Sequence, residues 1–231
     1  MSKPFTPLTQ LPHFDALSMP VLGVDDHLPA VPPERLHPQA LRERFQRSLE
    51  WTPEIVRERS FAQREPALAA VLIGIVMREQ PTVLLTQRTA HLSTHSGQVA
   101  FPGGKVDATD HDVVDTALRE SHEEVGLERE HVQVLGTISD YVTGTAFVVT
   151  PVVGLVSPAH TLSPNPNEVA SVFEVPLAFL MNPAYHRRHA LEAEGRRREW
   201  FSMPYQDGEE LRFIWGATAG MIRNFYRFLM A

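Results

Sequence analysis

The segment from Gly103 to Leu127 constrains this chain more than any other part of it. It reads GGKVDATDHDVVDTALRESHEEVGL, so a double glycine precedes a stretch in which apolar and small residues recur with helical spacing. We predict a helix over Asp112–Val125, with Asp110 or Asp112 as its N-cap and Gly126 as its left-handed end. The side chains expected to face a core are Val114, Ala117, Leu118, Ser121 and Val125. Such a helix packs one face against a sheet and leaves a polar face open for chemistry.

The polar face of this helix carries three carboxylates that can converge on one point. Glu120 and Glu124 are one turn apart, and Glu123 is their neighbour. Like charges at this spacing destabilise a helix, and acids in its C-terminal half also oppose the helix dipole. Arg119 offsets part of this charge, because it lies one turn before Glu123. A hard divalent cation such as Mg²⁺ or Mn²⁺ would offset the rest, and the alternative is an ordinary solvated face.

The run Arg119–Leu127, RESHEEVGL, resembles the second half of the Nudix box, G-x5-E-x7-R-E-U-x-E-E-x-G-U, in which U is apolar. Ser121 stands where the box has an apolar residue, and His111 stands where it has its first glutamate. A one-residue insertion in the preceding loop explains the second difference, with Asp110 or Asp112 as the substitute acid. The core of the box, R-E-x-x-E-E-x-G, is intact.

A second pair of segments resembles one branch of this family. Leu84–Thr89 reads LLTQRT and Gly97–Gly104 reads GQVAFPGG. Together they are similar to the motif upstream of the box in the coenzyme A diphosphatases, L-L-T-x-R-S-x3-R-x3-G-x3-F-P-G-G. The resemblance implies hydrolysis of coenzyme A at its diphosphate, giving 3′,5′-ADP and 4′-phosphopantetheine, with acyl-coenzyme A left open. Ser93 stands where the second arginine would be, so another nucleoside diphosphate derivative such as NADH or ADP-ribose is the alternative.

The resemblance also implies a metal-dependent site and assigns roles within it. The expected ligands of Mg²⁺ or Mn²⁺ are Glu120, Glu124 and Glu123, the last as a third ligand or as the base. Arg119 would orient these carboxylates. In this family the general base varies in position and can lie outside the box, so Glu168 is the first candidate and Glu174 the second. An alternative of another class is a non-catalytic module that senses a nucleotide, although three retained acids favour catalysis.

Groups close to the double glycine are expected to bind the substrate. Arg88 and Lys105 suit a diphosphate or a 3′-phosphate, and Gln98 offers a hydrogen bond. A turn at Gly103-Gly104 would let backbone groups approach a phosphate or a metal without a Cβ in the way. Three histidines of the surrounding loops are expected to be solvated and not metal-bound, namely His91, His95 and His111.

The rest of the chain alternates strands and helices, but hairpins outnumber crossovers, which favours a mixed sheet between helices. We expect an α/β (α+β) protein, a Nudix-type α/β/α sandwich with a mixed β-sheet, whose hydrolase domain spans residues 67–231. The predicted strands are Ala67–Met77, Thr82–Gln87, Gly97–Phe101, Val132–Ile138, Phe147–Val156, Ser171–Val175, Arg197–Tyr205 and Leu211–Ile214. The further predicted helices are Pro38–Glu50, Pro176–Met181 and Thr218–Leu229. The segment Trp215–Ala219 is interpreted as packing.

Residues 1–66 form a separate unit in this interpretation. Eight of the 19 prolines fall within Met1–Pro38, and proline excludes long helices and central strands. We expect an extended arm followed by the helix, lying on the main domain. A disordered tail over residues 1–34 is the alternative.

The composition of the chain excludes several classes of binding partner and of catalytic chemistry. The 28 acidic residues exceed the 21 basic ones, giving a net charge of −7, which disfavours nucleic-acid binding. The chain has no cysteine, so thiolate metal sites and cysteine nucleophiles are excluded. No apolar run is long enough to span a membrane, and no signal peptide is visible, so we expect a cytoplasmic protein that binds a small molecule. A homodimer is left open.

Overall fold

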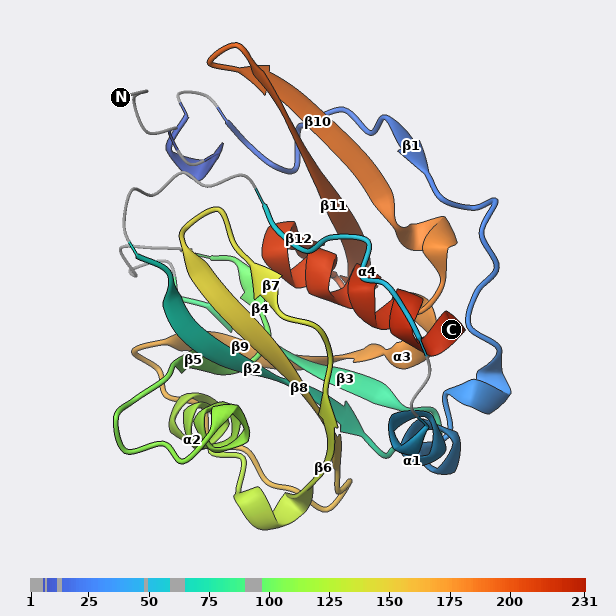
Figure 1. The fold of residues 1–231 in the computed structure, drawn as a ribbon, viewed down its shortest axis with the longest axis vertical. Helices are drawn as coiled ribbons and strands as arrows, with labels where there is room; N and C mark the ends of the chain where they lie inside the picture. Colours follow the sequence, from blue (N-terminus) through green and yellow to red (C-terminus); the bar gives the residue numbers. More distant parts are fainter. Residues whose placement is uncertain (1–5, 7, 12–13, 48–49, 59–64, 90–96) are drawn as a thin grey trace.

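The main body of the protein is a mixed sheet of eight strands (Figure 1). The computed structural model describes residues 6, 8–11, 14–47, 50–58, 65–89 and 97–231, without the side chain of Arg196. At the centre of the sheet, β2 (Ala67–Val76) and β8 (Phe147–Val156) run parallel over ten residue pairs. Their neighbours pair antiparallel. These are β3 (Thr82–Arg88), β4 (Val99–Ala100), β5 (Gly103–Lys105), β6 (Val132–Thr137), β7 (Tyr141–Val142) and β9 (Val169–Pro176).

Two helices cover the two faces of this sheet and complete the layers. Helix α2 (Val113–Val125) packs on one face, over a cluster that includes Leu72 and Val152. Helix α4 (Gly216–Met230) packs on the other, over a larger cluster that includes Ile73 and Phe225. Alternate residues of β2 point to opposite faces, which is why its long apolar run serves both clusters. The expected mixed α+β sandwich is confirmed.

A second sheet of four strands lies beyond α4 and was not predicted (Figure 1). Its order is β1 (Gly23–Val24), β10 (Arg187–Ala193), β11 (Arg196–Asp207) and β12 (Glu210–Trp215), all antiparallel. The predicted hairpin around Asp207-Gly208 is present as β11 and β12. The strand β10 was missed because it carries few apolar residues and pairs on one side with a segment that is distant in the sequence.

Several predicted bounds need correction. The predicted strand Gly97–Phe101 is limited to Val99–Ala100, since Pro102 interrupts pairing. The double glycine was predicted as a turn, but Gly103–Lys105 is the short strand β5, paired with β2. The short helix after β9 is α3 (Leu177–Leu180).

The proline-rich arm runs along the main body instead of forming regular layers. It contains η1 (Leu8–Gln10), β1, η2 (Pro33–Arg35) and α1 (Pro38–Gln46), the last shorter than predicted. Phe45 of α1 packs against β6, where a Cβ at Gly136 would lie 3.0 Å from its ring. Within residues 14–34, Asp25 and Val31 are buried, each 3% exposed, whereas most of the other residues are exposed. The division of the chain at residue 66 stays a prediction. Two further 3-10 turns are η3 (Arg129–His131) and η4 (Pro183–Tyr185).

Candidate active site

Helix α2 begins and ends where its capping residues predicted. Asp112 is the N-cap, and its Oδ1 accepts a hydrogen bond of 2.9 Å from the backbone N–H of Asp115. Gly126 ends the helix with φ of 69°, and its N–H donates to the carbonyl four residues earlier at 2.8 Å. Ser121, at the apolar position of the box, is buried, and its Oγ donates to a carbonyl one turn earlier at 2.6 Å. The hydroxyl therefore has a partner inside the core.

Arg119 holds the acidic groups around it in fixed positions. Its guanidinium donates two hydrogen bonds to Asp110, at 2.8 and 3.0 Å, one to Glu120 at 2.9 Å and one to Glu123 at 3.1 Å. It also donates to the carbonyl of Lys105 at 3.0 Å. These hydrogen bonds from Arg119 hold the pKa of Asp110 well below its usual range. Asp110 is thus the acid that pairs with the box arginine, while Asp112 caps the helix.

Glu124 is the most buried of the three box glutamates, with 3% of its side chain exposed. Arg88 Nη1 lies 3.2 Å from its Oε1, and the N–H of Gly103 donates to its Oε2 at 3.2 Å. Burial raises the pKa of Glu124 to about 7. Burial also raises the pKa of Glu120, although the neighbouring arginine opposes this shift. Both carboxylates therefore lack full charge compensation from the protein.

The double glycine lets β5 pass directly beside these carboxylates. A Cβ at Gly104 would overlap the carboxylate of Glu120. Gly103 has φ of 154°, and a Cβ there would lie 2.6 Å from the Cα of Val71 on the neighbouring strand. Any other residue at Gly104 would clash with the carboxylate of Glu120. Any other residue at Gly103 would clash with the backbone of β2.

The two candidate bases lie in different surroundings. Glu168, just before β9, accepts a hydrogen bond of 3.2 Å from Asn165, and its negative charge adds to the burial that raises the pKa of both Glu120 and Glu124. Glu174 instead accepts hydrogen bonds from Arg78, the shortest at 2.7 Å. The charge of Glu168 is therefore close to Glu120 and Glu124, which with Glu123 we call the acidic group. Glu174 belongs to a separate ion pair.

The acidic group suits a hard cation by its chemistry. Its donors are carboxylate oxygens, the ligands that Mg²⁺ and Mn²⁺ prefer. Within the described ranges, no three His, Asp or Glu side chains stand in a metal-binding cluster. Glu123, with 55% of its side chain exposed, turns to Arg119, and Glu124 turns to Arg88. Glu120 and Glu124 are the residues that could hold a metal, and the partial compensation of Glu124 by a guanidinium is consistent with a cation at this position.

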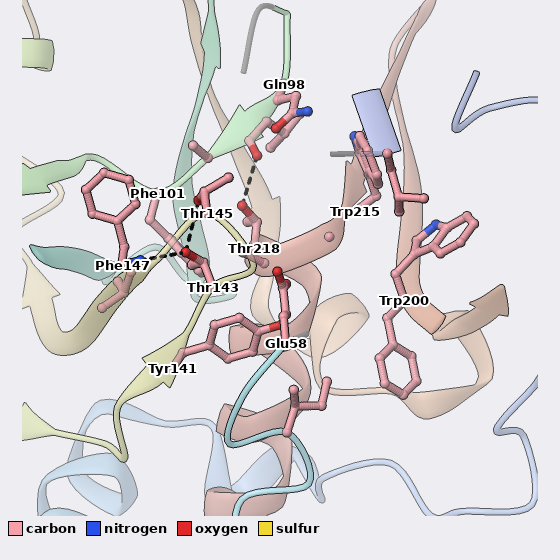
Figure 2. Close-up of a pocket in the computed structure, with 18 of the residues that line it drawn as sticks. Glu58, Gln98, Phe101, Tyr141, Thr143, Thr145, Phe147, Trp200, Trp215 and Thr218 are labelled. Atoms are coloured by element: carbon pink, nitrogen blue, oxygen red, sulfur yellow. Dashed lines mark hydrogen bonds between the residues drawn. The ribbon is translucent and has the colours of Figure 1, made fainter. Parts of the chain in front are cut away.

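A cavity of about 890 Å³, part of which is drawn in Figure 2, is lined by Arg88 and Gly103, the two residues that contact Glu124. The box glutamates themselves are not among its described lining residues. Its lining includes five residues predicted to bind substrate, which are Arg88, Gln98, Gly103, Gly104 and Lys105. Figure 2 shows Gln98 at one end of the pocket, above Thr218, and Trp200 and Trp215 on the side opposite Thr145. The cavity is far larger than a diphosphate and has room for both halves of a larger substrate.

Sequence reasoning missed the other walls of this cavity. Trp200, Trp215 and Thr218 come from the second sheet and the start of α4, and Glu58 comes from the arm. The tryptophan before Gly216 was seen in the sequence but interpreted as packing. His91, Ser93 and His95 lie outside the described residues. His111 is exposed, and its backbone N–H donates to Asp115 at 3.2 Å.

Comparisons with known proteins agree with this geometry. The family model described as the NUDIX domain matches residues 66–202. A protein of Enterobacter sp. (strain 638), named "Uncharacterized Nudix hydrolase NudL", is 46% identical over 159 residues, which cover 68% of this chain and 79% of the relative. The protein of the same name from Escherichia coli O7:K1 is 46% identical over 157 residues, with the same coverage of both chains.

Solved structures of this fold are also similar to the chain. A C. elegans Ap4A hydrolase in a binary complex aligns with a TM-score of 0.42 and 20% identity, over 51% of this chain and 85% of that one. The Nudix hydrolase RenU of M. smegmatis aligns with a TM-score of 0.40 and 27% identity, over 49% and 71% of the two chains.

The family match and these relatives identify an enzyme that hydrolyses pyrophosphate bonds. The chain belongs to the Nudix family. It is therefore a hydrolase of a nucleoside diphosphate derivative, and members of this family generally use divalent metals such as Mg²⁺ or Mn²⁺. None of the described helices is both long and apolar enough to cross a membrane.

Proposed function

We propose that this Nudix hydrolase cleaves the diphosphate bond of coenzyme A, with Mg²⁺ or Mn²⁺, to give 3′,5′-ADP and 4′-phosphopantetheine. The observation that carries the proposal is the meeting of the two upstream motif segments at the box. Arg88 of the first segment and Gly103 of the second both contact Glu124, each at 3.2 Å. The segments that resemble the coenzyme A branch are thus part of the same site as the acidic helix.

In this proposal the acidic helix binds the metal. Glu120 and Glu124 are its ligands, and Glu123 is a third ligand or a base. When bound, the metal would polarise a phosphoryl oxygen and lower the pKa of a water. Arg119 keeps the carboxylates in position through its hydrogen bonds to Asp110, Glu120 and Glu123.

The remaining predicted residues act on water and substrate. Glu168 accepts a proton from the attacking water, which forms a bond to one phosphorus while the bridging anhydride oxygen leaves with the other phosphate. Arg88 and Lys105 bind the phosphoryl oxygens, and Gln98 hydrogen-bonds the substrate. Gly103 and Gly104 bring backbone groups close to the carboxylates and to the diphosphate without a Cβ in the way.

The substrate is tested by incubating the protein, with Mg²⁺ or Mn²⁺, with coenzyme A, acyl-coenzyme A, NADH and ADP-ribose, and separating the products. We expect 3′,5′-ADP from coenzyme A, no turnover in EDTA, and recovery when Mn²⁺ is added back. Cleavage of NADH or ADP-ribose alone would overturn the coenzyme A assignment. Binding without turnover of any substrate, from neutral to alkaline pH, would favour the nucleotide-sensing alternative.

We propose a small molecule, and neither a nucleic acid nor a membrane, as the partner of this site. A cytoplasmic location and a homodimer stay predictions from the sequence. Size-exclusion chromatography with light scattering measures the oligomeric state.

A further inference from the structure

The wall of the cavity opposite the main sheet is formed where the second sheet ends and α4 begins. Ser202 of β11 pairs with Trp215, the last residue of β12. Before Ser202, β11 pairs with β10 alone among the described strands. The chain leaves the sheet after Trp215 and enters α4, so this edge of β11 and the first turn of α4 border the cavity together.

The first turn of α4 presents backbone donors to the cavity. Gly216, Ala217 and Thr218 all line it. The N-cap residue is Trp215, which forms no side-chain capping bond, and the first turn holds no acidic residue. Backbone N–H groups of a first helical turn lack intrahelical acceptors and lie at the positive end of the helix dipole, so they favour an anion.

Trp200 supplies a second and independent indication of a ligand on this wall. Its side chain is 8% exposed and lines the same cavity, and its Nε1–H has no hydrogen-bond acceptor among the described residues. His189 stacks on the indole at 5.5 Å and Phe14 packs edge-on at 5.8 Å, which fixes the ring. A buried donor without an acceptor is costly, so its retention beside the cavity points to an acceptor supplied by the ligand.

The charges around the cavity agree with an anionic ligand. Three carboxylates line it, and each already has partners. Glu54 accepts hydrogen bonds from two arginines at 2.7 and 2.9 Å, Glu58 from a tyrosine hydroxyl at 2.7 Å, and Glu199 from an arginine at 2.8 Å. Arg57 and Lys105 line the cavity too, and no carboxylate pairs with either within the described ranges. The accessible excess is therefore positive.

We propose that the first turn of α4 and the indole N–H of Trp200 form a second anion subsite, which binds a phosphate monoester of the substrate away from the diphosphate that is cleaved. The inference rests on the proposed function, because coenzyme A carries such a group as its 3′-phosphate. The subsite distinguishes substrates that carry this phosphate monoester from those that lack it. The acidic helix acts on the diphosphate, which both kinds of substrate have.

The subsite is tested by binding of two products that differ in one phosphate, 3′,5′-ADP and AMP. Fluorescence of the cavity tryptophans reports the dissociation constants. We expect the wild-type protein to bind 3′,5′-ADP at least tenfold more tightly than AMP. Equal affinities would overturn the proposal.

Two substitutions at Ala217 distinguish the effect of a negative charge on phosphate binding from the effect of a larger side chain. Ala217→Asp places a carboxylate in the first turn, where it favours the helix but repels a phosphate. We expect it to reduce the preference for 3′,5′-ADP to less than threefold, with the affinity for AMP unchanged. Ala217→Asn has the same shape without the charge and should keep the preference. Equal weakening of both nucleotides by Ala217→Asp would contradict the subsite.

Trp200→Phe tests the indole donor, because it keeps an aromatic ring and removes the N–H. We expect three- to tenfold weaker binding of 3′,5′-ADP and unchanged binding of AMP, with Trp215 still reporting. An unchanged constant for 3′,5′-ADP would remove Trp200 from the subsite.

The two proposals fail separately. Cleavage of coenzyme A together with equal affinities for the two nucleotides would overturn the subsite alone. A preference for 3′,5′-ADP without cleavage of coenzyme A would overturn the proposed substrate and support the subsite.

Discussion

Glu124 illustrates how a functional group is kept at the expense of stability. Its carboxylate is nearly fully buried, with one arginine and one backbone N–H as partners at 3.2 Å. Two contacts of this length do not replace the hydration that the carboxylate loses, which is why burial raises its pKa to about 7. A residue that is poorly compensated in this way is expected where a cation belongs.

Glu124→Gln should separate activity from stability. We expect kcat to fall by about two orders of magnitude or more, because the substitution removes a proposed metal ligand. EDTA removes any bound metal, so that Glu124 titrates without it. The pKa of Glu124 is 4.5 in the unfolded chain and about 7 in the folded protein, so the protonated carboxyl group stabilises the fold below pH 4.5. This stability is lost as the pH rises through about 7. The variant should therefore be more stable than the wild type at pH 8, by about 1–3 kcal/mol. Urea unfolding at pH 5 and pH 8 measures this, and a less stable variant at pH 8 would contradict it.

Gly104 makes a contact that a single methyl group would block. In Gly104→Ala, the new Cβ would overlap the Glu120 carboxylate, so that carboxylate or the strand must shift. We expect a loss of kcat of about 100-fold, since misplacement by an ångström is costly in catalysis. Steady-state kinetics at saturating Mg²⁺ measures this. Wild-type kcat in the variant would show that Glu120 does not need its present position.

At the level of elements, the sequence predicted what depends on local signals. The bounds of α2 followed from Asp112, Gly126 and the helical period, and the helix begins within one residue of the expected position. The central strands were recognised by their apolar runs. The three box glutamates were chosen by their spacing, but within the described residues they do not converge on one point, because Glu123 turns to Arg119 and Glu124 to Arg88.

The elements that were missed depend on contacts between distant parts of the chain. Glycine disfavours strands, so Gly103–Lys105 gave no strand signal, and its pairing with β2 is a tertiary effect. Strand β10 pairs on one side with Gly23 and Val24, more than 160 residues earlier in the chain. No local pattern indicates such pairing, and the wall that carries Trp200 was missed for the same reason.

The N-cap of α2 gives a prediction at this scale. Asp112→Ala removes the acceptor for the N–H of Asp115 and should lower the free energy of unfolding by about 1 kcal/mol. For a chain of this length, we expect a fall in Tm of about 2–4 °C. The control is Asp26→Ala, an exposed carboxylate of the arm, which should change Tm by less than a degree or two. Equal effects of the two substitutions would show that the cap does not stabilise the helix.

At the scale of the whole molecule, a partly buried group of charges joins three parts of the chain. Asp25 of the arm accepts two hydrogen bonds of 2.8 Å from Arg188 of β10 and lies 3.0 Å from Arg223 of α4. Glu54, farther along the arm, pairs with the same two arginines. His186 also belongs to this group, and burial lowers its pKa to about 4, so the imidazole is neutral and accepts from Arg223.

This arrangement explains how the arm is tied to the cavity. Arg188 and Glu54 line the cavity, while Arg223, 1% exposed, lies inside α4. The charges therefore fix the arm, the second sheet and the helix relative to one another. An arm that carried no structural role would not need the buried carboxylate of Asp25 and the partly exposed one of Glu54 opposite two arginines.

The substitution Asp25→Asn tests whether these ion pairs hold the arm in place. The substitution keeps the shape but removes one of two negative charges, and it leaves the buried Arg223 with Glu54 as its remaining carboxylate partner. Removing one partner of a buried ion pair costs about 3–5 kcal/mol, so we expect a loss of about 3 kcal/mol in urea unfolding at pH 7.5. Because the wall of the cavity is held by the same charges, KM should rise more than kcat falls. Glu43→Gln is the matched control, since it affects an exposed pair with Arg47 at 3.6 Å and should cost less than about 1 kcal/mol. If both variants lose the same small amount, the arm is held by its apolar contacts and the charges are dispensable.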